Sequence, residues 1–142
     1  MDYESLAHDF MEVMHHMHGR NPQKRVNDSL HGENFVLSYI SSHEGNVIPS
    51  DISNAMGATS ARIAAALNSL EKKGLISRRI DVEDRRRILI DLTDAGREHV
   101  HEQNQKMMNF VTNMLKYLGE DDAKEYIRIM KKLANRNPED FI

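Results

Sequence analysis

Only three residues, Gly57-Ala58-Thr59, separate two stretches that both have helical character. Pro49 suits the first position of a helix because its missing N–H would have no partner there, and we predict a helix over 49–56. Thr59 suits an N-cap, and the residues after it predict a second helix over 60–73, with one apolar face formed by Ile63, Leu67 and Leu70. Two helices joined by so tight a turn predict a helix-turn-helix.

Two strand-like runs, 75–80 and 87–92, follow the second helix. In the later run, Ile88, Ile90 and Leu92 alternate with other positions, as in a strand with one buried face. The segment between the runs is short, so the two predict a hairpin with its tip near 81–86. A helix-turn-helix followed by a hairpin is a winged helix, and the predicted fold class is mainly α with a small β-hairpin.

Helices are also expected on both sides of this unit. Apolar residues at helical spacing predict them over 3–18, about 31–43 and 94–118, with a last one starting at Asp121-Asp122. The terminal helices exceed what a compact winged helix needs, and their methionine and aromatic stripes must be buried somewhere. An intrachain core and a subunit interface both remain open, and the interface is favoured. We predict a single domain over 1–142, with a winged helix-turn-helix over 30–97 and dimerisation helices over 1–20 and 98–142.

Charge is unevenly distributed along the chain. The 142 residues carry a net charge of −3, yet the segment from Lys72 to Arg87 carries +4, so the remainder carries −7. A local basic patch on an acidic body favours an anionic partner. The alternative is a solvated hairpin in which Arg85, Arg86 and Arg87 pair only with Asp81, Glu83 and Asp84.

This layout indicates binding to double-stranded DNA. A helix fits the major groove, which is about 12 Å wide, and a hairpin tip can place an arginine in the minor groove, where negative potential is concentrated. Arg62 can bind a base edge or a phosphate, and Asp84 can direct the guanidinium of Arg86 or Arg85. The predicted DNA-binding residues are Ser50, Thr59, Ser60, Ala61, Arg62, Ala65, Ser69, Lys72, Asp84, Arg85, Arg86 and Arg87.

The segment NAMGATSARIAAALNSLEKKGLISRRIDVEDRRRILIDLTDAGR resembles the MarR family of winged helix-turn-helix transcription regulators, with the strongest match over about 50–97. The resemblance implies a homodimer joined through the terminal helices, binding a pseudo-palindromic operator, most often as a repressor. It also implies that Arg86, with Asp84 as its brace, enters the minor groove. Ala65 and Ser69 stand where many members carry basic residues, so base reading by the helix is expected to be limited here.

Members of this family typically respond to small aromatic or anionic effectors bound between the dimer helices and the DNA-binding lobe. The resemblance therefore implies such a pocket, and Met14, Met17, Phe35 and Tyr39 are candidates to line it. At helical spacing, the same four residues also suit an ordinary core.

Other classes of function have less support. No metal site is predicted, because His8 and His15 would lie about 10 Å apart and the His15 and His18 pair lacks a third ligand at useful spacing; a metal-responsive regulator is kept as an alternative. No catalytic motif and no cofactor are expected. A winged helix used only for protein contact remains an alternative. The chain lacks cysteine, a secretory leader and a membrane-spanning run, so we expect a cytoplasmic protein with no membrane partner.

Overall fold

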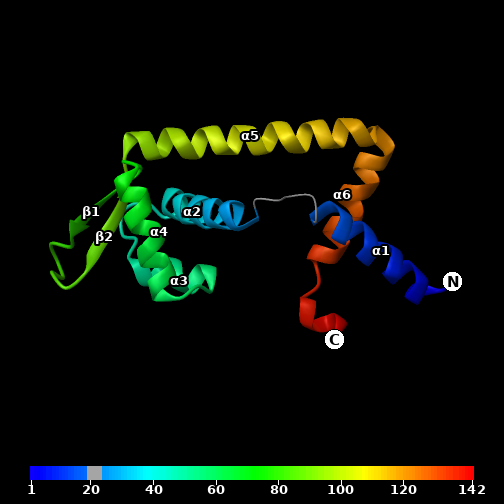
Figure 1. The fold of residues 1–142 in the computed structure, drawn as a ribbon, viewed down its shortest axis with the longest axis horizontal. Coiled ribbons are helices and arrows are strands. Elements are labelled where there is room, and N and C mark those ends of the chain that lie inside the picture. Colours follow the sequence, from blue (N-terminus) through cyan, green and yellow to red (C-terminus); the bar gives the residue numbers. More distant parts are fainter. Residues whose placement is uncertain (19–23) are drawn as a thin grey trace. The chain divides into compact units, whose positions relative to one another are not determined.

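The computed structural model describes the backbone of residues 1–18 and 24–142 and the side chains of residues 1–17 and 32–142. Within these residues the chain forms two units, 1–96 and 97–142. The elements follow in the order α1 (Tyr3–His18), α2 (Lys24–Ser42), α3 (Pro49–Met56), α4 (Ser60–Lys72), β1 (Ile76–Ile80), β2 (Ile88–Leu92), α5 (Asp94–Leu118), α6 (Glu120–Ala134) and a 3-10 helix (Pro138–Phe141) (Figure 1).

The helix-turn-helix is present as predicted, because each residue of its turn has a suitable local role. Gly57 ends α3 with φ +67, the left-handed conformation that favours glycine. Ser53 Oγ donates to the carbonyl of Ala58 at 2.7 Å, and Thr59 Oγ1 accepts from the N–H of Arg62 at 3.2 Å. The turn therefore fixes where α4 begins, and Thr59 is the N-cap that the sequence indicated.

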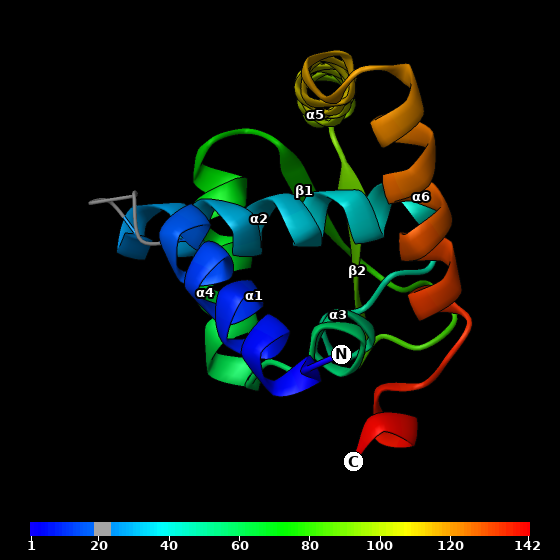
Figure 2. The same ribbon diagram turned by 90° about the vertical axis from the view of Figure 1, so that its right-hand side faces the viewer.

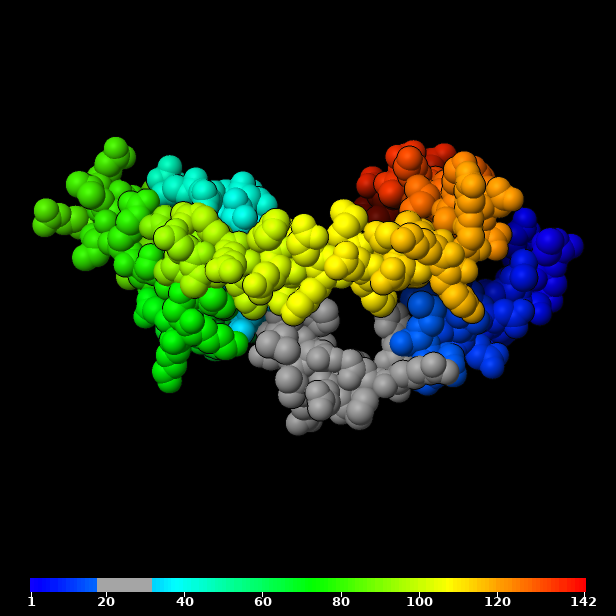
Figure 3. Space-filling view, turned by 90° about the horizontal axis from the view of Figure 1, so that it is seen from above, coloured from blue at the N-terminus to red at the C-terminus, as the bar shows by residue number. Residues whose placement is uncertain are grey.

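Strands β1 and β2 form an antiparallel pair in which Ile76 lies opposite Leu92 and Ile80 lies opposite Ile88. A single bridge joins Val47, in the segment after α2, to Ile90 at the centre of β2, with the N–H of Ile90 donating to the Val47 carbonyl at 2.9 Å. We call the segment 76–92, with β1, β2 and their connecting loop, the wing. Its side chains reach outward at one end of the space-filling view (Figure 3).

One hydrophobic core holds α2, α3, α4 and the wing together as a lobe spanning residues 32–96. Each buried aliphatic side chain stabilises the fold by about 1.5–3 kcal/mol relative to an exposed one. The buried apolar residues of this lobe are Val36, Leu37, Ile40, Val47, Ile52, Ile63, Leu67, Leu70, Ile76, Leu89, Ile90 and Leu92.

Three sequence-based predictions need correction here. Helix α2 begins at Lys24 and not near His31, so its first two turns were missed. Phe35 was expected to face inward but is 39% exposed, while Leu37 fills the buried position. Ala55 was also expected to face inward and is exposed. Smaller shifts of one residue occur at the starts of β1, β2 and α6 and at the ends of α2 and α4.

Helix α5 is a continuous helix of 25 residues, seen lengthwise in Figure 1 and end-on in Figure 2. It starts where predicted, because Thr93 Oγ1 accepts from the N–H of Gly96 at 3.0 Å and caps the first turn. The apolar side chains of α1 and α6 are exposed in the single chain, among them Phe10, Met17, Tyr126, Met130 and Leu133.

Candidate nucleic-acid interface

The outer surface of α4 is built from small and basic residues. Ser60, Ala61, Arg62, Ala65 and Lys72 are exposed and Ser69 is half-buried, while the opposite face of the helix is buried in the core. Ser50 lies exposed in the first turn of α3. Alanine and serine let the backbone of α4 come close to another molecule, so the surface suits a partner with a deep groove.

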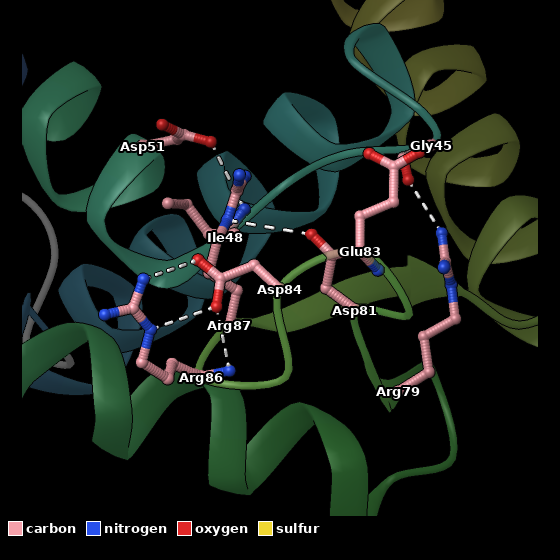
Figure 4. Close-up of polar contacts among 9 residues, drawn as sticks. All are labelled: Gly45, Ile48, Asp51, Arg79, Asp81, Glu83, Asp84, Arg86 and Arg87. Carbon is pink, nitrogen blue, oxygen red and sulfur yellow. Dashed lines mark hydrogen bonds and ion pairs between the residues drawn. The ribbon is translucent and has the colours of Figure 1, made fainter.

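The loop of the wing brings Asp84 and Arg86 together as the sequence indicated. Nε of Arg86 donates to Oδ1 of Asp84 at 3.1 Å, and Nη2 donates to Oδ2 at 3.4 Å (Figure 4). The N–H of Arg86 also donates to Oδ1 of Asp84 at 3.1 Å. Yet the side chain of Arg86 is 91% exposed. The carboxylate therefore fixes the direction of the guanidinium without covering it.

Arg86 also favours the ionised form of the Asp84 carboxyl. Its side-chain hydrogen bonds, followed by its backbone hydrogen bond, hold the pKa of the Asp84 carboxyl below its usual range. Asp84 thus stays ionised throughout the range in which most proteins are folded, and the brace keeps its negative charge.

Hydrogen bonds within the loop hold its backbone in one shape. The N–H of Asp81 donates to the Arg87 carbonyl at 3.0 Å, and the N–H of Arg87 donates to the Asp84 carbonyl at 2.9 Å. Oδ1 of Asp81 accepts from the N–H of Glu83 at 3.0 Å. The tip is a preformed turn, so little conformational entropy would be lost when it meets a partner.

Internal pairing accounts for only part of the arginine cluster. Arg86 pairs with Asp84, and Nε of Arg87 lies 3.9 Å from Oδ2 of Asp81, a long ion pair (Figure 4). Within residues 32–96, Arg62, Lys72 and Arg85 form no ion pair or side-chain hydrogen bond with the protein. These three cations and the exposed Arg86 are available to an anionic partner.

The base of the wing is held by a residue that sequence reasoning missed. Nε of Arg79 donates to Oδ2 of Asp91 at 2.7 Å. Its Nη2 donates to the carbonyl of Gly45, also at 2.7 Å (Figure 4). Together with the bridge from Val47 to Ile90, this arginine joins the wing to the segment between α2 and α3. The contacts span 12 and 34 residues, and no local sequence pattern indicates them.

Two further ion pairs orient α4. Nζ of Lys73 donates to Oε2 of Glu33 at 2.7 Å, which joins the end of α4 to α2. On the other side, Nη2 of Arg78 donates to Oδ1 of Asn68 at 2.8 Å and its Nε lies 3.3 Å from Oε2 of Glu71. Lys73 and Arg78, which the sequence placed in the basic patch, therefore hold α4 against α2 and β1.

The predicted effector residues lie on two helices. Met14 and Met17 are exposed on α1, and Phe35 lies one turn before the half-buried Tyr39 on α2. The Tyr39 ring stacks on His43, with centroids 4.1 Å apart, and Nδ1 of His43 lies 2.9 Å from the Tyr39 carbonyl. Tyr39 is thus already in contact with the ring of His43, which lies one residue beyond the end of α2.

In the part of the chain that the structure describes, no three histidine or acidic side chains gather as a set of metal ligands. A helix able to cross a bilayer is likewise not found among the described elements.

A family model described as a winged helix DNA-binding domain matches residues 33–111. The uncharacterized HTH-type transcriptional regulator YdgJ of Bacillus subtilis (strain 168) is 30% identical over 93 residues, which are 66% of this chain and 57% of YdgJ. The transcriptional repressor MprA of Escherichia coli (strain K12) is 29% identical over 112 residues, which are 78% of this chain and 62% of MprA. The chain thus covers less than two thirds of either relative. The structure of a single-residue mutant of MepR from S. aureus is 25% identical and superposes with a TM-score of 0.75, covering 95% of this chain and 98% of the other.

Proposed function

The chain belongs to the winged helix DNA-binding domain family. From that premise we propose that it is a transcription regulator of the MarR type, which binds a specific double-stranded operator as a homodimer and represses transcription there. The proposal places α4 in the major groove and the tip of the wing in the adjacent minor groove. Such a protein would act in the cytoplasm of a bacterial cell, where the chromosome lies.

The arrangement of Arg86 carries this proposal. A guanidinium that enters a narrow minor groove must be exposed and charged. It must also be oriented before binding, because otherwise the conformational entropy lost by the side chain offsets the free energy of the contact. Arg86 meets these three conditions, because Asp84 holds it from one side and leaves it 91% exposed. The uncovered cations of Arg85, Arg62 and Lys72 would then neutralise phosphates on either side of the contact.

Helix α4 would make the second contact. Its N-terminal turn carries Ser60, Ala61 and Arg62, and the N–H groups of a helix N-terminus favour a phosphate. Arg62 is the one long side chain in that turn, so it would either bind a guanine edge or clamp a phosphate. Base reading would then depend on few side chains, and the shape of the minor groove would supply part of the specificity.

The exposed apolar side chains of α1 and α6 support the homodimer. Tyr126, Met130 and Leu133 follow the helical spacing on α6, and Phe10 and Met17 lie on α1. Two copies that bury these stripes against each other would present two α4 helices to one face of a duplex, and half-sites about 10 base pairs apart would follow. A small aromatic or anionic effector bound near Met14, Met17, Phe35 and Tyr39 would shift affinity if it favoured one spacing of the lobes.

The test begins with selection of bound duplexes from a random pool at near-physiological salt. A pseudo-palindrome with half-sites about 10 base pairs apart is the expected outcome. Arg86→Ala should then weaken binding by roughly tenfold or more per wing, because it removes a charge-assisted contact. Arg136→Ala is the matched control, since it removes the same charge from an exposed position outside the lobe. Equal losses in the two variants, or no enrichment of any sequence, would refute the proposal.

A further inference from the structure

The outer end of the wing carries three exposed aliphatic side chains. Ile80 is 63% exposed, Ile88 46% and Val82 86%. Ile80 and Ile88 are opposite partners in the antiparallel register, so their Cβ atoms lie about 5 Å apart. Branched residues suit strands, but aliphatic groups gathered on an exposed hairpin end also mark a surface that meets another molecule. We call these three residues the aliphatic strip.

Two residues of the aliphatic strip, Ile80 and Ile88, lie on the same side of the hairpin as α4. Alternate residues of a strand share a face, so Ile76, Arg78 and Ile80 form one row of β1. Ile76 at the inner end is buried in the core, and Arg78 contacts Asn68 and Glu71 of α4. Ile80 continues that row beyond the core, with Ile88 beside it. A duplex lying along α4 would therefore pass the face on which Ile80 and Ile88 stand.

We infer that the aliphatic strip packs against the deoxyribose walls of the minor groove when Arg86 enters it. This inference rests on the proposed function and adds a second class of contact to it. The walls of the groove are formed by sugar C–H groups, the rims carry phosphates and the floor is lined by base edges. Aliphatic side chains suit the walls, and a guanidinium suits the floor, where negative potential is greatest.

The charges around the aliphatic strip favour DNA over an apolar protein surface. Val82 and Ile88 flank a loop whose residues 85–87 are all arginines. The exposed guanidinium of Arg86 and the uncovered side chain of Arg85 would both have to be desolvated against an apolar partner, which disfavours such a partner. Against a polyanion, the same charges attract the partner.

The two classes of contact differ in their response to salt. A cation on a phosphate releases counterions, so its loss lowers the slope of log K against log [salt]. An aliphatic contact with a sugar releases water and leaves that slope unchanged. The inference therefore predicts a contribution to affinity that persists as salt rises.

The experiment measures binding of the selected duplex over a series of salt concentrations. In the triple variant Ile80→Thr, Val82→Thr and Ile88→Thr, each new side chain is still β-branched and keeps its preference for a strand. We expect about tenfold weaker binding at every salt concentration, with an unchanged slope. Arg86→Ala should instead lower the slope by about one per wing. Ile80→Val with Ile88→Val should recover most of the lost affinity.

The outcomes separate this inference from the proposed function. A wild-type chain that selects no duplex refutes the proposed function and the inference with it. If the wild type binds tightly and the triple threonine variant either binds equally well or shows a lowered slope of log K against log [salt], the inference is overturned and the proposed function stands. If the triple threonine variant binds DNA as tightly as the wild type but no longer controls transcription, the aliphatic strip contacts a protein partner, and the inference is also overturned. If the triple variant does not fold, Val82→Thr alone is used, because its side chain is 86% exposed; about twofold weaker binding at constant slope is then expected.

Discussion

Replacing Gly96 with alanine should destabilise the protein through a backbone clash. A methyl group at this position would lie 2.0 Å from the carbonyl oxygen of Leu75, 3.0 Å from its carbonyl carbon and 3.3 Å from Cδ2 of Leu92. The nearest neighbour is backbone, so no side-chain rotation relieves the contact. An ordinary separation of at least 3.4 Å requires the start of α5 and the segment at Leu75 to move apart by more than an ångström.

The cost follows from the bonds that hold those segments together. The N–H of Thr93 donates to the Leu75 carbonyl at 3.1 Å, and Thr93 Oγ1 donates to the Gly74 carbonyl at 2.6 Å. Overpacking costs about 1–3 kcal/mol and each weakened hydrogen bond about 1 kcal/mol. Alanine regains about 1 kcal/mol through its helix propensity. The net loss is about 3 kcal/mol, which lowers Tm by about 10 °C in a chain of this size.

Urea unfolding followed by circular dichroism, at fixed protein concentration, measures this loss. Gly32→Ala is the matched control, because Gly32 lies inside α2 and an added methyl group would meet only Cε of Met56, at 3.5 Å. That variant should gain up to about 1 kcal/mol, since alanine restricts the unfolded chain. If Gly96→Ala unfolds within about 1 kcal/mol of the wild type, the close approach of α5 to Leu75 is not a constraint on the fold.

Two further predictions concern ion pairs of the lobe. The pKa of Asp84 lies below its usual range in the folded chain and about 3.9 in the unfolded chain, so its brace on Arg86 is complete above about pH 5 and is lost as pH falls through the lowered value. The ratio of the operator affinity of the wild type to that of Asp84→Asn should therefore stay constant between about pH 8 and pH 5. A ratio that falls between about pH 8 and pH 6 would contradict the role of the ionised brace. Lys73→Met should cost about 1 kcal/mol in urea unfolding, because it removes the 2.7 Å ion pair with Glu33 that joins the end of α4 to α2. A free energy of unfolding equal to that of the wild type would show that this pair does not stabilise the lobe.

Local patterns in the sequence predicted most of the elements that form the lobe. Pro49, Gly57 and Thr59 each have a backbone preference that acts within one turn, and the structure places each where that preference is satisfied. The brace from Asp84 to Arg86 was also predictable, because its partners are two residues apart and the loop between the strands is short. The alternation of Ile88, Ile90 and Leu92 indicated the strand, but it did not show where along the strand the core ends. Ile88 is exposed, whereas Ile90 and Leu92 are buried.

Other features depend on information that a local pattern does not contain. The first half of α2 includes Asn27, Asp28 and Ser29, which have weak helix propensity, so the periodicity was read only from about residue 31. The contacts from Arg79 to Gly45 and from Lys73 to Glu33 join residues 34 and 40 positions apart. Such pairs are brought together by the tertiary fold, and their basic members resembled surface charge in the sequence.

If the chain is the regulator proposed above, the balance of charge on the lobe affects how it divides its time between its operator and other DNA. The affinity of nonspecific DNA binding rises with the number of phosphates that a protein neutralises, and a bacterial chromosome contains millions of nonspecific sites. In this chain, with its net charge of −3, acids already occupy several of the lobe's cations. A regulator built in this way would lose few of its copies to competing DNA. Its operator would then remain occupied at a low copy number per cell, and release by an effector would not be delayed by rebinding nearby.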